Sequence, residues 1–191
     1  MPNPVTFAKL DVINQVLTAQ GENVLQNAEA IEGGTKHALV MRTHYDAVVQ
    51  FCFGKTAWRT FTSKKALNKL SGAPTNRWAA AWNLPSDMIK LLSTWPPSNY
   101  EIQNRQILTN ETTRLEVDYI RLVEEGYWPA WFTRFVVAEL VMRTCKGITG
   151  EAADQDMKDE RARAENDALF QDAQQQPNQQ IQANDFIDVR Y

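Results

Sequence analysis

Apolar residues recur at helical spacing near the start of the chain. Leu10 to Gln20 has this spacing and is predicted to form a short amphipathic helix, with Asp11 as its N-cap and Gly21 as its stop. Residues 36–53 show a clearer period along one stripe, and Thr35 precedes them as a candidate cap. Two helices are therefore expected before residue 54.

Two more helices are predicted in the last third of the chain. Residues 126–146 are nearly unbroken in apolar character, with Arg134, Glu139 and Arg143 as interruptions, which indicates a central buried helix. Residues 151–173 carry only a thin apolar stripe and are otherwise polar. The final helix is therefore expected to pack by one narrow face.

The chain between these helices alternates in short steps and is rich in turn residues. This pattern predicts extended segments joined by hairpins, and hence a small antiparallel sheet. The Ala66–Leu70 segment is either a strand or a turn of helix, and the loop after it is expected at residues 71–74. The other expected strands are Trp58–Thr62, Trp78–Asn83, Met88–Ser93, Tyr100–Gln103, Gln106–Leu108 and Leu115–Ile120.

Composition places the chain among single-domain globular proteins. It has 191 residues, of which 43% are apolar and 23% charged, which argues against disorder throughout. The start of the chain lacks the pattern of a signal peptide, and no apolar run is long enough to span a membrane. The protein is therefore expected to be made and kept in a cytoplasm, without a membrane partner.

Charge is distributed unevenly along the chain. Residues 55–90 hold seven Lys or Arg and one acid, Asp87, whereas residues 151–172 hold eight acids and three basic residues. The basic stretch also contains aromatic residues, the ingredients of a surface for single-stranded nucleic acid. Such aromatic residues more often form a core or a subunit interface, because large rings need to be covered.

No motif for catalysis or cofactor binding is found, so neither an enzyme nor a cofactor is expected. The acids closest to a catalytic arrangement are Glu116, Asp118, Glu124 and Glu125, which are the residue types that glycoside hydrolysis needs. Solvated acids on a half-exposed strand are the commoner explanation of Glu116 and Asp118.

The histidines and cysteines are expected to be structural. His37 and His44 lie seven residues apart, but no cysteine or acid accompanies them at the spacing of a metal motif, so no metal site is expected. Cys52 and Cys145 each fall inside an apolar helical pattern. Buried thiols are favoured over a disulfide.

The last residues form a separate segment. From Gln174 onward the chain is rich in Gln and Asn, a composition that cannot bury enough apolar surface to order itself. It nevertheless ends in an apolar cluster, which predicts a segment that orders against another surface rather than a frayed end. The cluster consists of Phe186, Ile187, Val189 and Tyr191.

Several stretches, taken in order, resemble the tail tubular protein A family, the head-to-tail adaptors of short-tailed bacteriophages. They are LDVINQVLTAQGE, the 36–53 helix running into WRTF, WNLPSD, WPAWFTRFVVAEL, GITGEAADQ and ALFQDAQQQ, which together span most of residues 10–176. The residues of the family pattern, expected in a core or an interface, are Trp58, Phe61, Trp78, Trp82, Leu84, Pro85, Asp87 and Trp131.

The resemblance implies an α+β fold that is mainly α. An antiparallel helix bundle would fill residues 1–173 with a small antiparallel β insertion at about 56–121, and residues 174–191 would be an extended tail that docks on the portal protein. The family forms rings, twelve subunits in well-known members, that join the portal to a tail nozzle protein and continue the channel for double-stranded DNA. The expected location is the virion, after synthesis in the host bacterium.

Two other functions stay open at this stage. The basic aromatic middle also fits a nucleic-acid-binding ring of the DNA-packaging machinery. The acid cluster leaves a virion-associated cell-wall hydrolase as a weaker alternative.

Overall fold

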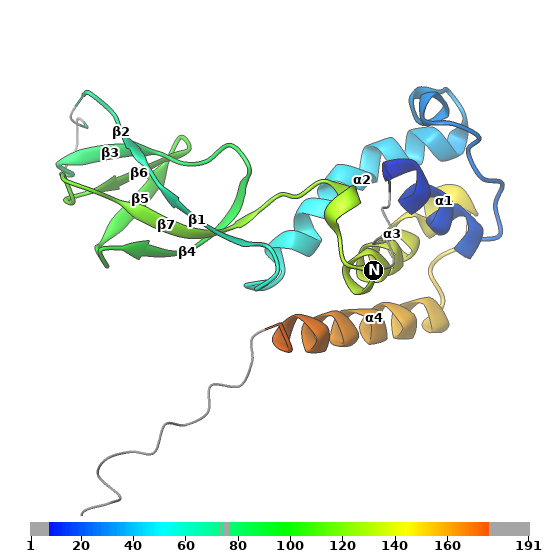
Figure 1. Ribbon diagram of the computed structural model, residues 1–191. Coiled ribbons are helices and arrows are strands. Elements are labelled where there is room, and N and C mark those ends of the chain that lie inside the picture. The colour runs from blue at the N-terminus through cyan, green and yellow to red at the C-terminus, as the bar shows by residue number, and fades with distance from the viewer. Residues whose placement is uncertain (1–7, 73, 75–76, 176–191) are drawn as a thin grey trace, which may run out of the picture.

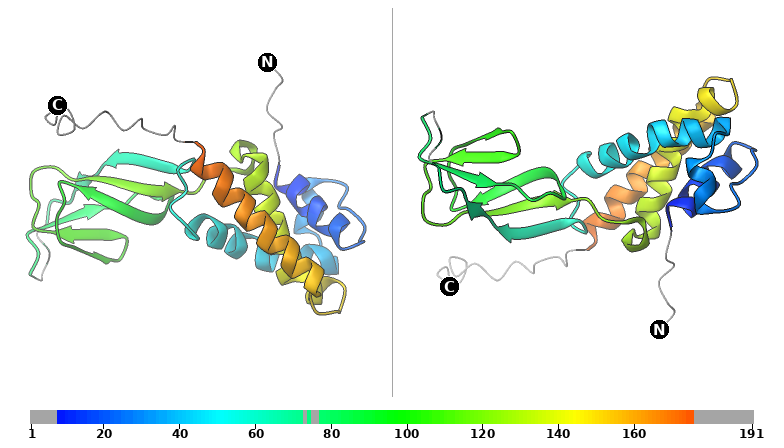
Figure 2. Two further views of the ribbon diagram at one scale, coloured as in Figure 1. Left: turned by 90° about the horizontal axis from the view of Figure 1, so that it is seen from below. Right: turned by 90° about the horizontal axis from the view of Figure 1, so that it is seen from above.

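The computed structural model describes residues 8–72, 74 and 77–175. These residues form two lobes that lie end to end, a helical lobe and a β lobe (Figure 1). The views in Figure 2 show that the molecule is elongated along the line joining the lobes. The residues of the apolar tail cluster, Phe186, Ile187, Val189 and Tyr191, lie outside the described part of the chain.

The helical lobe begins with two of the predicted helices. Helix α1 spans Lys9–Ala19 and ends before Gly21, whose φ of 74° suits glycine. The prediction that Asp11 is the N-cap is wrong, because Ala8 takes that position. Asp11 lies in the first turn, where its carboxylate accepts a hydrogen bond from the backbone N–H of Ala8 at 2.9 Å. After the short 3₁₀ helix η1 (Ala28–Glu32), α2 spans Lys36–Gly54.

Side chains that cap the backbone set where two of the predicted helices begin. The Thr35 hydroxyl caps α2 by accepting a hydrogen bond from the N–H of Ala38 at 3.3 Å, as expected. The last two helices are α3 (Ala130–Ile148), which follows the 3₁₀ turn η2 (Glu125–Tyr127), and α4 (Gln155–Ala173). Helix α4 starts later than predicted because the Asp154 carboxylate caps it, accepting from the N–H of Met157 at 2.8 Å.

Helix α3 is the centre of the helical lobe and packs against α1, α2 and α4. Its buried face carries Phe132, Phe135, Val136 and Leu140, all inaccessible to solvent. Helix α4 contributes few apolar side chains, since Ala164 and Ala168 are buried and Met157 packs partly buried against the core. The predictions of a central buried α3 and a narrow-faced α4 are confirmed.

The β lobe consists of two antiparallel sheets. One has three strands in the order β1 (Thr62–Ala66), β7 (Glu116–Arg121), β4 (Met88–Trp95). The other has four strands in the order β2 (Asn68–Lys69), β3 (Ala80–Asn83), β6 (Gln106–Thr109), β5 (Tyr100–Gln103). The chain from β1 to β2 passes from the outer strand of one sheet to the outer strand of the other.

The predicted fold class, a mainly α helix bundle with a small β insertion, is wrong. The protein is mixed, with four α-helices, about 46% of the described residues in helices and about 20% in strands of two sheets. The sheets have a hydrophobic core of their own, which includes Leu67, Trp82, Ile107, Leu115 and Val117. The β region is therefore a lobe with its own interior rather than an appendage of a bundle.

The predicted strand at Trp58–Thr62 is a turn for most of its length. Trp58 is completely buried, and the Thr62 hydroxyl donates a hydrogen bond to the Trp58 carbonyl at 2.7 Å, which tightens the chain before β1 begins. Strand β1 then pairs with β7 in register from Thr62 opposite Ile120 to Ala66 opposite Glu116. The Ala66–Leu70 segment is extended rather than helical.

The lobes meet where two segments, residues 55–61 and 122–128, cross between them (Figure 1). The C-terminal end of α4 reaches the same place. The buried carboxylate of Asp172 accepts hydrogen bonds from the backbone N–H of Arg59 at 2.8 Å and from the N–H and hydroxyl of Thr60 at 3.0 and 2.9 Å. The last turn of α4 is thereby fixed to the turn that leads into the β lobe.

Candidate assembly surfaces

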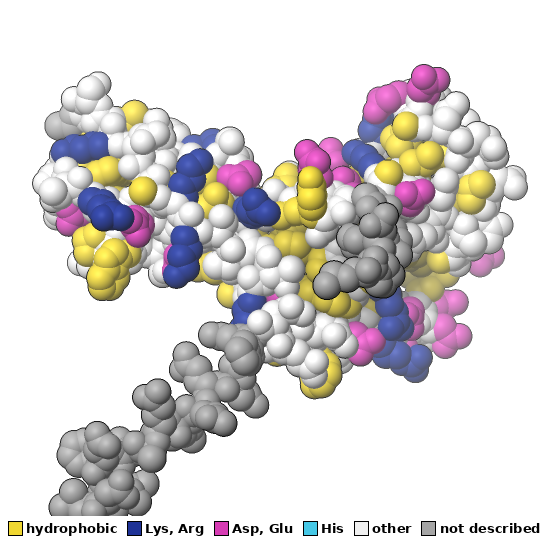
Figure 3. All heavy atoms as spheres, in the orientation of Figure 1, with side chains coloured by type: hydrophobic (Ala, Val, Ile, Leu, Met, Phe, Trp, Pro, Cys, Tyr) yellow, Lys and Arg dark blue, Asp and Glu magenta, His cyan; other side chains and the backbone are white. Residues whose placement is uncertain are grey.

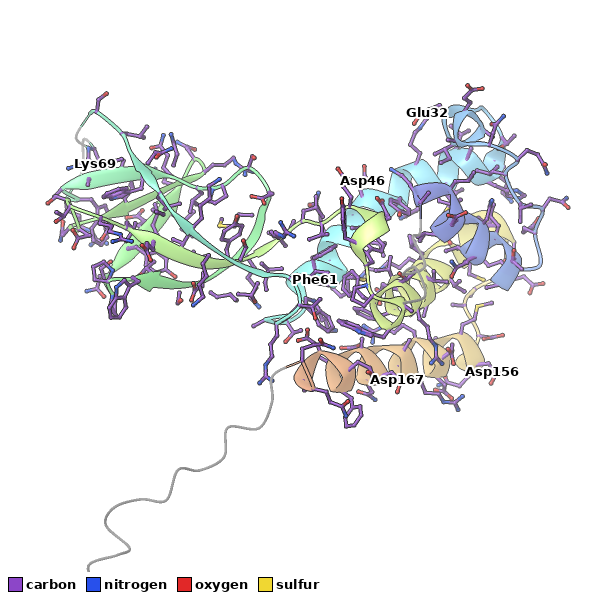
Figure 4. The ribbon with its side chains drawn as sticks, viewed as in Figure 1. Glu32, Asp46, Phe61, Lys69, Asp156 and Asp167 are labelled. Carbon is purple, nitrogen blue, oxygen red and sulfur yellow. The ribbon has the colours of Figure 1, made fainter. Side chains whose placement is uncertain are left out.

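The aromatic residues at the start of the family-like pattern lie in the core. Trp58 is 0% exposed and Phe61 2% exposed, and the Trp58 indole N–H donates to the Cys52 carbonyl at 2.8 Å. Trp131, which is partly buried, stacks near Trp58 with ring centroids 5.8 Å apart. Figure 4 places Phe61 at the junction of the lobes. These rings stabilise the junction, and Trp58 and Phe61 are not available to a partner.

The middle of the pattern builds the core of the β lobe. Trp82 is buried and its indole N–H donates to the Glu111 carbonyl at 3.1 Å. Leu84 and Pro85 are buried at the turn that follows β3. Asp87, at the end of this turn, is half-buried and accepts a hydrogen bond from the Tyr119 hydroxyl at 3.3 Å.

Trp78 is also largely covered, with 9% of its surface exposed. Its indole N–H donates to the Glu101 carboxylate at 3.0 Å, and the Arg77 guanidinium lies 5.0 Å from its ring centroid. Because Trp58, Phe61 and Trp78 are all covered, they do not form an aromatic surface on which the bases of single-stranded nucleic acid could stack.

Other aromatic residues are strongly exposed. Trp95 at the end of β4 is 66% exposed, Tyr127 in η2 is 75% exposed and Phe170 on α4 is 60% exposed. Tyr100 and Ile102 of β5, the next strand after Trp95 in the chain, are exposed as well. Large exposed apolar side chains of this kind commonly mark interfaces.

A cleft lies between α2 and the segment that returns from the β lobe to the helical lobe. Its volume is about 410 Å³, and Figure 3 shows the surface hollowed between the two lobes. The residues that line it, called the acidic cleft below, are Tyr45, Asp46, Val49, Gln50, Asp87, Leu122, Val123, Glu124, Glu125 and Trp128.

The carboxylates of the acidic cleft have few positive partners. Asp46 pairs with Lys9 at 3.2 Å, and within the described residues Asp87, Glu124 and Glu125 form no ion pair. The Tyr45 hydroxyl donates a hydrogen bond to Glu125 at 2.9 Å. Burial raises the pKa of Tyr45 well above its usual value, and the neighbouring negative charge of Glu125 adds to this. Tyr45 therefore stays protonated as a donor to Glu125.

Glu116 and Asp118, considered as catalytic acids, have other partners. Glu116 forms an ion pair with Arg114. Asp118 accepts a hydrogen bond from the Ser93 hydroxyl at 3.0 Å and lies 3.9 Å from the Lys64 ammonium. These contacts are those of polar residues on the surface of a sheet.

A buried electrostatic contact is centred on Glu139 of α3, which is 1% exposed. Its carboxylate accepts hydrogen bonds from Arg143 at 2.6 Å and from Arg161 of α4 at 2.7 Å. Hydrogen bonding to Glu139 raises the pKa of Arg161. This contact joins α3 to α4 and is structural, because the carboxylate is fully engaged.

The cysteines and histidines are not brought together. Cys52 and Cys145 are free and buried, as predicted, and burial, with the charge of Glu139, raises the pKa of Cys52. His37 lies 3.3 Å from Glu22, whereas His44 is exposed. Among residues 8–72, 74 and 77–175, no three His, Cys, Asp or Glu side chains are grouped so as to hold a metal ion.

No helix in the described part of the chain has the length and hydropathy needed to cross a membrane. No protein-family model matches the chain, and no curated protein is significantly similar to it. The resemblance to phage adaptors therefore stays a prediction from the sequence.

Proposed function

We propose that this protein is a structural virion protein, a head-to-tail adaptor that forms a ring between the portal and the tail nozzle of a short-tailed bacteriophage. The observation that carries the proposal is the order of the family-like stretches over residues 10–176. No one of them is specific alone, but their order and spacing follow the family pattern from the first helix to the last.

The distribution of exposed aromatic residues supports assembly. A subunit of a closed ring contacts its two neighbours through two different surfaces, and it contacts the components above and below through others. Trp95, Tyr127 and Phe170 lie on separate elements, in the β lobe, at the junction and on α4. An elongated subunit with several separate apolar positions suits this arrangement.

Helix α4 and the tail that follows it have different proposed tasks. The tail from residue 174 leaves α4 at the junction and would dock on the portal through Phe186, Ile187, Val189 and Tyr191. Helix α4 presents exposed acids, among them Asp156 and Asp167 (Figure 4). In this proposal they face the channel, where a negative surface does not hold passing DNA.

The experiment is to mix the purified full-length protein with its cognate portal and to measure the mass and shape of the product. Sedimentation and electron microscopy should detect a ring on the portal. A truncation lacking residues 174–191 keeps Ala173, whose carbonyl accepts from Arg59, and should fold but not attach. A control of full length, with Phe186, Ile187, Val189 and Tyr191 each replaced by Ser, should fail in the same way.

An alternative, a nucleic-acid-binding ring, is favoured by the exposed Lys64 and Lys65 on β1. It requires salt-dependent retention of DNA by the protein alone. A protein that ignores the portal and retains DNA would replace the adaptor with this alternative. A protein that instead digests peptidoglycan, with loss of lysis in Glu124→Gln or Asp118→Asn, would be a hydrolase.

A further inference from the structure

The β lobe carries a line of lysines along its outer strands. Lys64 and Lys65 belong to β1 and Lys69 to β2, and each strand is the outermost of its sheet. These three residues are called the lysine edge below. Figure 3 shows basic side chains spread over this lobe, and Figure 4 labels Lys69 at its far end.

The charges of the lysine edge are poorly matched within the subunit. The Lys64 side chain is 81% exposed and approaches Asp118 only at 3.9 Å. Lys69 donates to the carbonyl of Thr112 at 2.9 Å. Within the described residues, neither Lys65 nor Lys69 forms an ion pair.

The acidic cleft has the opposite character. Asp46, Asp87, Glu124 and Glu125 line it, and Lys9 is the cation paired with Asp46. Leu122, which also lines the cleft, is 41% exposed. Lysine has an apolar stem and a charged end, so its stem can cover Leu122 while its ammonium reaches a carboxylate.

We propose that the acidic cleft of one subunit binds the lysine edge of a second copy of this chain. This inference rests on the proposed function and names the contact between neighbouring subunits of the ring. The two surfaces are different parts of the chain, so the contact is heterologous and is repeated from subunit to subunit until the ring closes. Complementary charge selects the neighbour and its orientation.

The contact is made by side chains rather than by addition of a strand. Lysines on an outer strand discourage pairing of its backbone with another chain. Successive residues of a strand point to opposite faces of the sheet, so Lys64 and Lys65 extend from the two sides of this outer strand, where a neighbour's carboxylates can meet their ammonium groups. Assembly should therefore weaken as the salt concentration rises, because exposed charges are screened beyond about 10 Å at 0.1 M salt.

A charge exchange tests this contact in the full-length chain mixed with its portal. One variant carries Asp46→Lys and Glu124→Lys, a second carries Lys64→Glu and Lys65→Glu, and a third carries all four changes. The first two should each raise the protein concentration needed for half-maximal ring formation by about tenfold or more. The third should recover most of the loss, since its charges are again complementary.

The matched control is Asp156→Lys with Asp167→Lys, which changes net charge as much as the cleft variant but lies on α4 (Figure 4). It should assemble like the unmodified protein. Circular dichroism and thermal unfolding confirm that each variant is folded.

Each remaining outcome would overturn the inference. A cleft variant that assembles normally, a control that fails equally, or a fourfold variant that fails as badly as its parents would place the contact elsewhere. If the unmodified protein forms no ring on the portal, the proposed function itself fails.

Discussion

Asp172 at the end of α4 binds Thr60 twice, accepting hydrogen bonds from its backbone N–H and from its hydroxyl. The same carboxylate also accepts from the N–H of Arg59. We expect Asp172→Ala to lower the free energy of unfolding by about 3 kcal/mol, because three partly buried hydrogen bonds to a charged acceptor are lost together.

Urea unfolding measures this effect, and Asp167→Ala on the same helix is the control. The Asp167 side chain is 62% exposed and pairs with a half-exposed Arg134, so its loss should cost less than about 1 kcal/mol. Equal effects of the two substitutions would show that Asp172 does not anchor the junction.

Substitution of Trp58 should lower the free energy of unfolding far more than substitution of Trp95. Trp58 is completely buried, so Trp58→Ala should cost about 3–5 kcal/mol of stability. Trp95 is 66% exposed, and Trp95→Ser should change the free energy of unfolding by no more than about 0.5 kcal/mol. If Trp95 is an assembly residue, that variant should fold normally and yet form fewer rings, as counted by electron microscopy. Strong destabilisation by Trp95→Ser would instead identify it as part of the core.

Removal of Glu139 should loosen the contact between α3 and α4. Glu139→Ala leaves Arg143 and Arg161 without their shared acceptor. The expected loss is about 3 kcal/mol, at the low end for a broken buried ion pair, because both arginines are partly exposed. Thermal and urea unfolding give the value, with Glu160→Ala, which breaks an exposed pair with Arg134, as the comparison. A loss no larger than in that comparison would contradict a structural role for Glu139.

Tyr45 should give stability an alkaline dependence. The pKa of Tyr45 is raised in the folded protein. Its contribution to the free energy of unfolding is therefore fully present below the pKa of an unfolded tyrosine, about 10, and is lost as the pH rises above that value. Above that pH, the free energy of unfolding of the unmodified protein should fall by about 1.4 kcal/mol per pH unit more steeply than that of Tyr45→Phe. At neutral pH it should be about 1 kcal/mol less stable, because its hydrogen bond to Glu125 is lost. Urea unfolding from about pH 8 to about pH 11 compares the two slopes, and equal slopes would contradict the assignment.

The helices were predictable because their signals are local. The stripe through α2, the Thr35 cap and the apolar run of α3 all act within a few residues of the chain. Errors of a few residues arose where a side chain competed for a cap, as Asp154 does for α4. The positions of most strands were also indicated by alternation.

The assembly of the strands was not predictable in the same way. Strand β1 pairs with β7, whose partner residues lie 50 to 58 positions further along the chain. Strand β2 follows β1 after a single residue, yet it pairs with β3 in the other sheet. Periodicity does not reveal such partners, so two sheets with their own core were taken for one small sheet. The acidic cleft was missed for a related reason. Asp46 lies on α2 and Glu124 follows β7, and only the folded chain brings them to one cleft.

The anchoring of α4 beside the turn at Arg59 and Thr60 has a mechanical consequence. A pull on the chain beyond residue 175 passes through the backbone hydrogen bonds of Gln174 and Gln175 to those of Asp172 and to the carbonyl of Ala173, which Arg59 holds at 2.7 Å. These bonds act together and join two segments more than a hundred residues apart. The load is therefore shared between the helical lobe and the base of the β lobe, and the last turn of α4 does not unwind alone. A protein attached through its C-terminal segment would resist tension as one body.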